Sequence, residues 1–193
     1  MITHIQGRLT EKNPTDVVID CNGVGYLLNI SLHTYSQIPD KENLKLFTHL
    51  QVKEDSHTLY GFASLAEREI FRLLISVSGI GASTARTMLS SLTPKQVREG
   101  IVAEDVALIQ SVKGIGLKTA QRVIIDLKDK ILKVYDIDEG MVSQSNTNKD
   151  EALSALEVLG FAKKQSERVV DKIIEGQPDA NVEVIIKEAL KNL

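Results

Sequence analysis

Two short segments of this chain have the residue types of a backbone turn that binds anions. Each reads Ser-Val-x-Gly-Ile-Gly, at residues 76–81 and again at residues 111–116. Two glycines around one isoleucine permit positive φ angles and let a ligand approach the main chain closely. A helix that starts directly after the second glycine has amide groups without helical partners, which attract phosphates. We expect Ile80 and Ile115 to turn inward and anchor the two turns.

Side chains beside the turns extend this candidate phosphate site. Lys118 and Arg122 lie four residues apart and share one helix face after the second turn, while Arg86 follows the first turn. The alternative for each cation is an ordinary solvated charge. Ser83 and Thr84 offer hydroxyls that either contact phosphate or cap the helix. The complete candidate set is Gly79, Ile80, Gly81, Ala82, Ser83, Thr84, Arg86, Gly114, Ile115, Gly116, Lys118, Thr119 and Arg122.

A nucleotide-binding loop is the main alternative for a Gly-x-Gly turn. The dinucleotide motif needs a strand before the turn and a third glycine three positions on, where Thr84 and Thr119 stand here. Helical spacing of apolar residues precedes the first turn instead. Neither turn continues into the Gly-Lys-Ser/Thr of a Walker motif, so we expect no ATP hydrolysis by this chain.

The other reactive side chains do not form a catalytic or metal-binding pattern. The four histidines have no zinc-ligand spacing. Glu54 and Asp55 raise the alternative of a metal-dependent nuclease, but neighbouring side chains on a strand face opposite ways and no third ligand is evident. Cys21 alternates with apolar residues, which favours a core position over a reactive role. We therefore expect no catalytic residue, no metal and no cofactor.

The charge of the chain is unevenly divided. The net charge of −3 separates into −2 for residues 1–62, +4 for residues 63–133 and −5 for residues 134–193. The positive stretch contains both glycine turns, where phosphates need cations. No apolar run approaches the roughly 18 residues of a membrane span, and the N-terminus lacks a secretory signal. These features predict a cytoplasmic protein.

Alternating apolar residues predict strands in the first region. Two strands are expected on either side of Asn22-Gly23, which is a typical two-residue hairpin turn. Further strands are expected at residues 2–9, 44–52 and 57–62. About five short strands in some sixty residues predict a small barrel. The barrel lacks a face of basic and aromatic residues, so a role in assembly is favoured over nucleic-acid binding.

The second region is helical, and its helix starts are visible in the sequence. Residues 64–67 (Ser-Leu-Ala-Glu) and 93–96 (Thr-Pro-Lys-Gln) both have the capping-box pattern. Gly100 is a predicted helix stop. The two glycine turns then fall at corners between helices.

The last region is predicted to be a tethered helical domain. Residues 136–148 have no helical apolar period and are predicted to be a flexible linker. Three short amphipathic helices follow, the first ended by Gly160 and the last two separated by residues 176–178. Because this part is acidic and small, it is expected to bind protein rather than DNA.

The two turns resemble tandem helix-hairpin-helix motifs, which hold nucleic-acid phosphates through the hairpin backbone. Along its whole length the chain resembles the RuvA family of Holliday-junction branch-migration subunits. Besides both hairpins, the resemblance is carried by Ile5-Gln6-Gly7-Arg8-Leu9, Gly23-Val24-Gly25-Tyr26, Val52-Lys53-Glu54-Asp55, Leu59-Tyr60-Gly61-Phe62, Ala152-Leu153-Ser154-Ala155-Leu156 and Leu159-Gly160-Phe161.

This resemblance implies a multidomain fold with an organisation in four segments. It implies an OB-fold β-barrel for oligomerisation in residues 1–63, an all-α tandem helix-hairpin-helix domain in 64–135, the linker in 136–148, and a three-helix, UBA-like bundle in 149–193. The implied ligand is four-way junction DNA. The implied partners are the hexameric AAA+ motor RuvB, bound through Leu156, Leu159, Phe161 and Ile173, and the RuvC resolvase. The implied assembly is a homotetramer or two stacked tetramers.

The resemblance also gives Glu54 and Asp55 a role, that of an acidic pin near the junction crossover, whereas the residues alone favour a solvated turn. Carboxylates near converging phosphates repel them and hold the strands apart. The chain departs from the family where lysines often follow the second glycine, because it has residues 82–83 (Ala-Ser) and 117–118 (Leu-Lys) there. We therefore expect the second hairpin to hold phosphate more strongly. The competing function is a nuclease-like or accessory helix-hairpin-helix protein acting on ordinary or damaged duplex.

Overall fold

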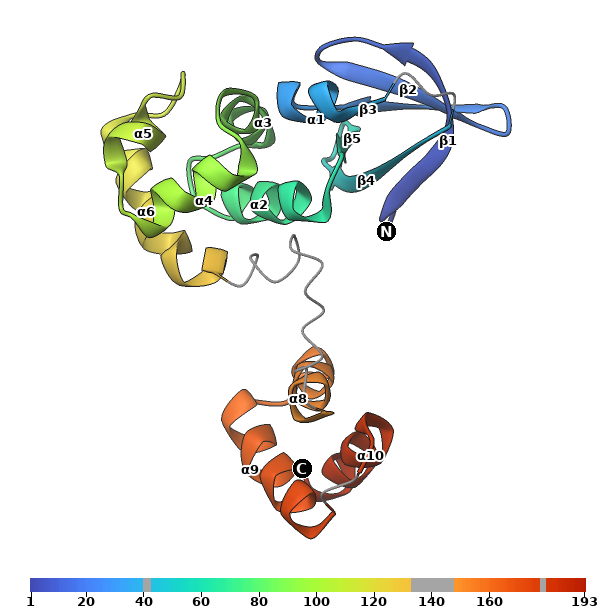
Figure 1. Ribbon diagram of the computed structural model, residues 1–193, viewed down its shortest axis with the longest axis vertical. Coiled ribbons are helices and arrows are strands. Elements are labelled where there is room, and N and C mark those ends of the chain that lie inside the picture. The colour runs from blue at the N-terminus through green and yellow to red at the C-terminus, as the bar shows by residue number, and fades with distance from the viewer. Residues whose placement is uncertain (40–42, 133–147, 178–179) are drawn as a thin grey trace. The chain divides into compact units, whose positions relative to one another are not determined.

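A computed structural model gives the structure of residues 1–39, 43–132, 148–177 and 180–193 (Figure 1). The chain divides into two compact units, Met1–Gly140 and Met141–Leu193, and each is described by itself. The predicted linker at 136–148 lies outside the described residues except for Asn148, which begins a helix. No helix of the described part is long and apolar enough to cross a membrane.

Five strands of the first unit close into a barrel in the order β1-β2-β3-β5-β4, as predicted for the OB-fold. All neighbours are antiparallel except β3 and β5, which form a short parallel pair. The Asn22-Gly23 turn has φ angles of 55° and 91°, as its sequence predicted. The elements are β1 (His4–Lys12), β2 (Asp16–Cys21), β3 (Val24–Asn29), α1 (Leu32–Gln37), β4 (Asn43–Val52) and β5 (His57–Phe62).

The barrel interior is aliphatic and fully enclosed. Val17, Ile19, Leu28 and Leu46 have no exposed surface. Cys21 is only partly buried at the edge of this core, where its Sγ lies 3.2 Å from the Gln6 carbonyl oxygen. The barrel core is thus built from the alternating apolar positions that the sequence indicates.

Among the described residues of the first unit, five helices follow the barrel and share one core with its last strand. Phe71 lies at the centre of this core, with its ring centroid 5.0 Å from that of Tyr60 and 4.9 Å from that of Phe62. The helices are α2 (Leu65–Ile75), α3 (Ala82–Ser91), α4 (Pro94–Val102), α5 (Val106–Gln110) and α6 (Leu117–Ile131). Because Tyr60 and Phe62 belong to β5, the hairpin helices are packed directly onto the barrel.

Gly100 does not end its helix, in contrast to the prediction. Helix α4 continues to Val102, and Glu104 takes the left-handed conformation at φ 56°. A Cβ at Gly100 would lie 2.8 Å from the Leu108 side chain. The glycine is therefore explained by the close approach of α4 and α5, not by helix termination.

One of the two predicted capping boxes is complete. Thr93 accepts a hydrogen bond from the Gln96 N–H, and the Gln96 side chain accepts one from the Thr93 N–H. Ser64 likewise accepts from the Glu67 N–H at 3.1 Å, but the Glu67 carboxylate does not return to the cap. That carboxylate is fully buried and accepts hydrogen bonds from the hydroxyls of Ser31, the N-cap of α1, and Thr34 on α1.

The described residues of the second unit, 148–177 and 180–193, form a bundle of three helices, as predicted. It contains α8 (Asn148–Val158), α9 (Lys163–Gly176) and α10 (Val182–Asn192) (Figure 1). Gly160 follows α8 with φ 96°, which agrees with its predicted role at the helix end. The buried core comprises Ala152, Leu153, Leu156, Val170, Ile185 and Ala189.

Candidate nucleic-acid interface

The two glycine turns have nearly the same backbone conformation. The φ angle is +94° at Gly79 and +92° at Gly114, a region that favours glycine. The next glycines, Gly81 and Gly116, are extended, with φ and ψ of −87° and 167° in one and −84° and 167° in the other. Each of these extended glycines is the N-cap of the following helix, so both helices begin where the sequence predicted.

The hydrogen bonds of the turns repeat as well. The amide of each central isoleucine bonds to a valine carbonyl three residues earlier, Ile80 to Val77 and Ile115 to Val112, at 3.1 Å in both copies. Ser76 and Ser111 donate their hydroxyls to leucine carbonyls at 2.7 Å in both copies. Ile80 and Ile115 are buried, with exposed fractions of 4% and 5%. Their inward orientation confirms that they anchor the turns and leaves only their backbone for a ligand.

Both helices after the turns start without a side-chain cap. Neither N-cap glycine can supply one, and no acidic residue lies in the first turn of α3 or α6. Ser83 is exposed and Thr84 is half-buried. The structure of the described residues gives neither of their hydroxyls a hydrogen bond, so they do not cap α3. The N-termini retain their partial positive charge for an anion.

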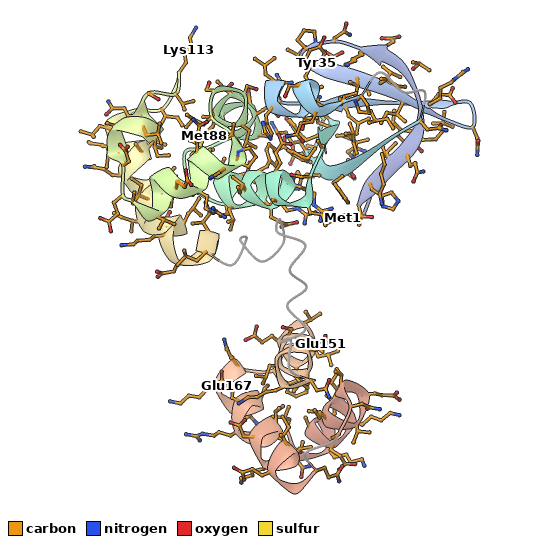
Figure 2. The ribbon with its side chains drawn as sticks, in the orientation of Figure 1. Met1, Tyr35, Met88, Lys113, Glu151 and Glu167 are labelled. Carbon is orange, nitrogen blue, oxygen red and sulfur yellow. The ribbon has the colours of Figure 1, made fainter. Side chains whose placement is uncertain are left out.

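The second hairpin carries three exposed cations, Lys113, Lys118 and Arg122. Within the described residues none of the three forms an ion pair. Lys113 points away from the ribbon in Figure 2. It was missed as a candidate although it lies inside the repeat, one residue before the positive-φ glycine, where the first copy has Ser78. The second hairpin thus combines the backbone turn with a local positive charge.

Arg86, the cation of the first hairpin, is directed at the barrel. Its Nη1 donates to the Asn29 Oδ1 at 2.8 Å and to the Thr15 carbonyl oxygen at 3.3 Å. The side chain is half-buried in this position. The first hairpin therefore offers phosphate mainly its backbone amides and the hydroxyls of Ser83 and Thr84.

The adjacent carboxylates Glu54 and Asp55 lie in the turn between β4 and β5. The turn is closed by a hydrogen bond from the Lys53 amide to the Ser56 carbonyl oxygen at 2.8 Å. Both acidic residues are exposed, and no ion pair in the described part of the chain neutralises them. The barrel thus presents a short, negatively charged turn to solvent.

The four predicted partner contacts of the second unit differ in accessibility. Leu156 is fully buried and supports the bundle from inside, so its side chain is not available to a partner. Leu159 is 57% exposed, and Phe161 and Ile173 are half-buried. Val158 was missed and is the most exposed of this group at 87%. Its place just before Gly160 at the end of α8 was the signal that could have identified it.

Across residues 1–39, 43–132, 148–177 and 180–193, no three His, Cys, Asp or Glu side chains are grouped to hold a metal ion.

Comparison with known proteins finds matches to three segments of the chain, which correspond to the barrel, the hairpin helices and the three-helix bundle. Residues 1–61 match the RuvA N terminal domain, residues 71–129 the SAM-like Helix-hairpin-helix tandem, and residues 147–193 the RuvA C-terminal domain. The chain is also 69% identical over 193 residues to the Holliday junction branch migration complex subunit RuvA of Flavobacterium psychrophilum, covering all of both chains. This chain belongs to the RuvA family.

Other RuvA relatives match over the full length too. The chain is 69% identical over 193 residues to RuvA of Christiangramia forsetii and 52% identical over 201 residues to RuvA of Bacteroides thetaiotaomicron, with complete coverage of both chains in each pair. The RuvA matches cover the barrel and the three-helix bundle, and the hairpin match covers both glycine turns. The RuvA family consists of subunits of the Holliday junction branch migration complex, and this chain is one of them.

Proposed function

We propose that this chain is a non-catalytic subunit that binds four-way DNA junctions through their phosphates, keeps the strands apart at the crossover and recruits a motor. One observation carries the proposal. Two hairpins with the same backbone geometry and uncapped helix N-termini share a unit with an exposed acidic turn. To distinguish a branched DNA from a linear one, a protein needs both sites that bind phosphate and a group that repels it.

The hairpins hold phosphate through the first amides of α3 and α6. Lys113, Lys118 and Arg122 add Coulombic attraction at the second hairpin. Contacts of this kind fix the position of the DNA backbone but carry no base information, so binding depends on shape and not on sequence. Several such weak contacts summed over a symmetric oligomer give a firm grip.

The turn with Glu54 and Asp55 acts by repulsion. Its carboxylates are exposed and form no ion pair with any described residue, so they disfavour a phosphate backbone that runs straight across them. A linear duplex is therefore penalised, whereas separated strands at a crossover pass on either side. We expect the Glu54→Gln, Asp55→Asn double variant to bind linear duplex more tightly and to lose part of its junction preference.

Assembly and partner contacts are assigned to faces outside the hairpins. Val24 and Leu27 on β3 are 54% and 56% exposed and are suited to contacts within a homotetramer, or between units of two stacked tetramers. Val158 and Leu159 at the end of α8 supply an exposed apolar surface for the hexameric ATP-driven motor RuvB. The junction resolvase RuvC is a further expected partner, reached through the shared DNA.

The deciding experiment compares a four-way junction with a linear duplex of equal length, in the same buffer and at stated salt. We expect tighter binding to the junction, and no cleavage of either DNA by the pure protein with magnesium. Equal affinity for both DNAs would remove the junction-specific function. Cleavage would instead favour a nuclease.

The motor contact is tested separately. Adding RuvB and ATP should convert a labelled junction into two duplexes only when this chain is present. The Leu159→Ser variant should bind junctions normally and support this conversion poorly, whereas a variant of an exposed residue on α10, Lys187→Ser, should support it fully.

A further inference from the structure

The first hairpin is joined to the barrel by a polar contact that involves one face of α3. Arg86 and Ser90 lie four residues apart on this face. Arg86 donates from Nη1 to the Asn29 side chain and to the Thr15 carbonyl oxygen. The Ser90 Oγ accepts a hydrogen bond from the Leu32 amide at 3.1 Å and donates to the Arg86 carbonyl oxygen at 2.8 Å. We call these five residues the barrel joint.

The barrel side of the joint is held in place by contacts that do not involve α3. The Thr15 carbonyl oxygen also accepts the Ile30 amide at 3.0 Å, which fixes its direction. The Asp16 carboxylate accepts from the Asn13 side chain at 3.0 Å and from the Thr15 hydroxyl at 2.7 Å. These two bonds, with a smaller effect of the Arg86 charge, lower the pKa of Asp16. The turn that receives Arg86 is therefore ordered by its own contacts.

The joint explains a difference between the hairpins that charge alone does not. The cations of the second hairpin are free of ion pairs within the described residues and are exposed to a ligand. Arg86 is the cation nearest the first turn, yet its Nη1 is bonded to the barrel that carries Glu54 and Asp55. A phosphate-binding hairpin and a repelling turn discriminate between DNA shapes only if the distance between them is fixed. A hairpin that is not held against the barrel can still bind the phosphates of any DNA.

We propose that Arg86 is a positioning residue that sets the first hairpin against the barrel and thereby determines the preference for four-way junctions over linear duplex. This inference rests on the proposed junction function. It assigns Arg86 no contact with DNA. Its loss should reduce junction binding and leave most of the binding to linear duplex.

The test uses variants from both sides of the joint in the full chain. Arg86→Ala removes the donor, and Asn29→Ala removes the acceptor but keeps the arginine charge. Each should weaken junction binding by about fivefold and duplex binding by less than about twofold, and the double variant should be no weaker than Arg86→Ala alone because the two residues act through one contact. Arg86→Lys should recover only part of the junction preference, since an ammonium group replaces the planar guanidinium.

The salt dependence of binding separates positioning from phosphate contact. Removing a cation that touches phosphate lowers the slope of log K against log salt by about 1. The slope should be unchanged in Arg86→Ala and Asn29→Ala. The matched control is Arg122→Ala in the second hairpin, which should lower the slope by about 1 and weaken junction and duplex binding alike.

The outcomes distinguish the two proposals. If the unsubstituted protein binds junction and duplex equally, the junction function fails and the positioning role fails with it. If the junction preference exists but Arg86→Ala lowers the salt slope while Asn29→Ala has no effect, Arg86 contacts phosphate and only the positioning role is overturned. An undiminished junction preference in both variants also overturns it.

Discussion

The two hairpins have the same backbone conformation but different side chains. Their glycine φ angles agree within a few degrees, and the hydrogen bonds of their central isoleucines have the same length. The second hairpin adds three exposed cations, whereas the first has two hydroxyls that do not cap α3 and an arginine bonded to the barrel. The comparison shows that the shape of a phosphate-binding turn and the charge around it are set by different residues.

The hairpins also differ in what supports them. Helix α3 of the first hairpin is bonded to the barrel by Arg86 and Ser90. Helix α6 of the second is tied to the turn between α4 and α5 by an ion pair between Lys128 and Glu104, which lowers the pKa of the Glu104 carboxyl. The first hairpin is therefore coupled to the barrel, while the second is coupled to its own helical neighbours.

The largest expected effect comes from the glycine that both turns share. Gly79→Ala and Gly114→Ala each place a Cβ at positive φ, at a cost of about 1–2 kcal/mol of stability. Because the backbones match, the two variants should lose similar stability in chemical denaturation. Each should weaken junction binding by about tenfold or more, equivalent to about 1.4 kcal/mol. A large loss from only one of them would show that the turns are not equivalent.

A smaller effect is expected from the side chains at corresponding places after the turns. Lys118→Ala should weaken junction binding by about fivefold and lower the salt slope by about 1, because it removes an exposed cation. Ser83→Ala, at the equivalent position of the first hairpin, should change affinity by less than about twofold. Titration of both variants at two salt concentrations tests the ranking. Comparable losses would contradict it.

Adding a positive charge to the first hairpin should reduce the difference in phosphate binding between the two hairpins. Ser83→Lys should tighten junction binding by about two- to threefold at low salt and raise the slope by about 1. The gain is smaller than the loss in Lys118→Ala because the surroundings of Ser83 are not adapted to a lysine side chain. Ser91→Lys at the far end of α3 adds the same charge as a control. An equal gain there would indicate general attraction only.

The smallest effect on DNA binding is expected from Glu67, which joins α2 to the barrel. Burial raises its pKa above the ordinary value of 4.5, although the hydroxyls of Ser31 and Thr34 partly oppose the shift. The folded state then holds this proton more tightly than the unfolded state, so stability falls as pH rises from 4.5 through the raised pKa.

The Glu67→Gln variant has no ionisable carboxyl at this position. The number of hydrogen bonds that its amide side chain can form with Ser31 and Thr34 should differ little from that of the carboxylate. Measured by urea denaturation, the stability of the unsubstituted protein relative to Glu67→Gln should decrease as the pH rises from 4.5 through the raised pKa of Glu67. Junction affinity at neutral pH should change by less than about twofold, since Glu67 does not touch the hairpin turns. A stability difference independent of pH would contradict the raised pKa.

Local signals in the sequence predicted the elements well. The Asn22-Gly23 turn and the glycines of both hairpins require particular backbone angles, and few other residues supply them. Alternation of apolar residues placed the strands for the same reason, since a strand buried on one face needs period two. The conformation of both turns and the inward direction of their isoleucines could therefore be predicted from short stretches of sequence.

The features that could not be predicted depend on residues distant in the sequence. Gly100 has the pattern of a helix stop, but its function is set by Leu108 on the next helix. Glu67 has the position of half a capping box, but two hydroxyls from α1 and its N-cap bind its carboxylate. No local pattern indicates that Asn29 lies beside Arg86 and accepts its hydrogen bond. A local motif specifies the backbone, and tertiary neighbours decide what its side chains do.

The closure of the barrel limits how strands of another chain could add to it. Strand β3 meets β5 through the pairs Leu28–Leu59 and Asn29–Tyr60, and this contact closes the five described strands into a barrel. A closed sheet offers little template for another chain to extend by backbone hydrogen bonding. If copies of this chain associate, we expect their contacts to rely on side chains, which point substitutions can tune. The same closure limits the edge-to-edge aggregation to which open sheets are prone.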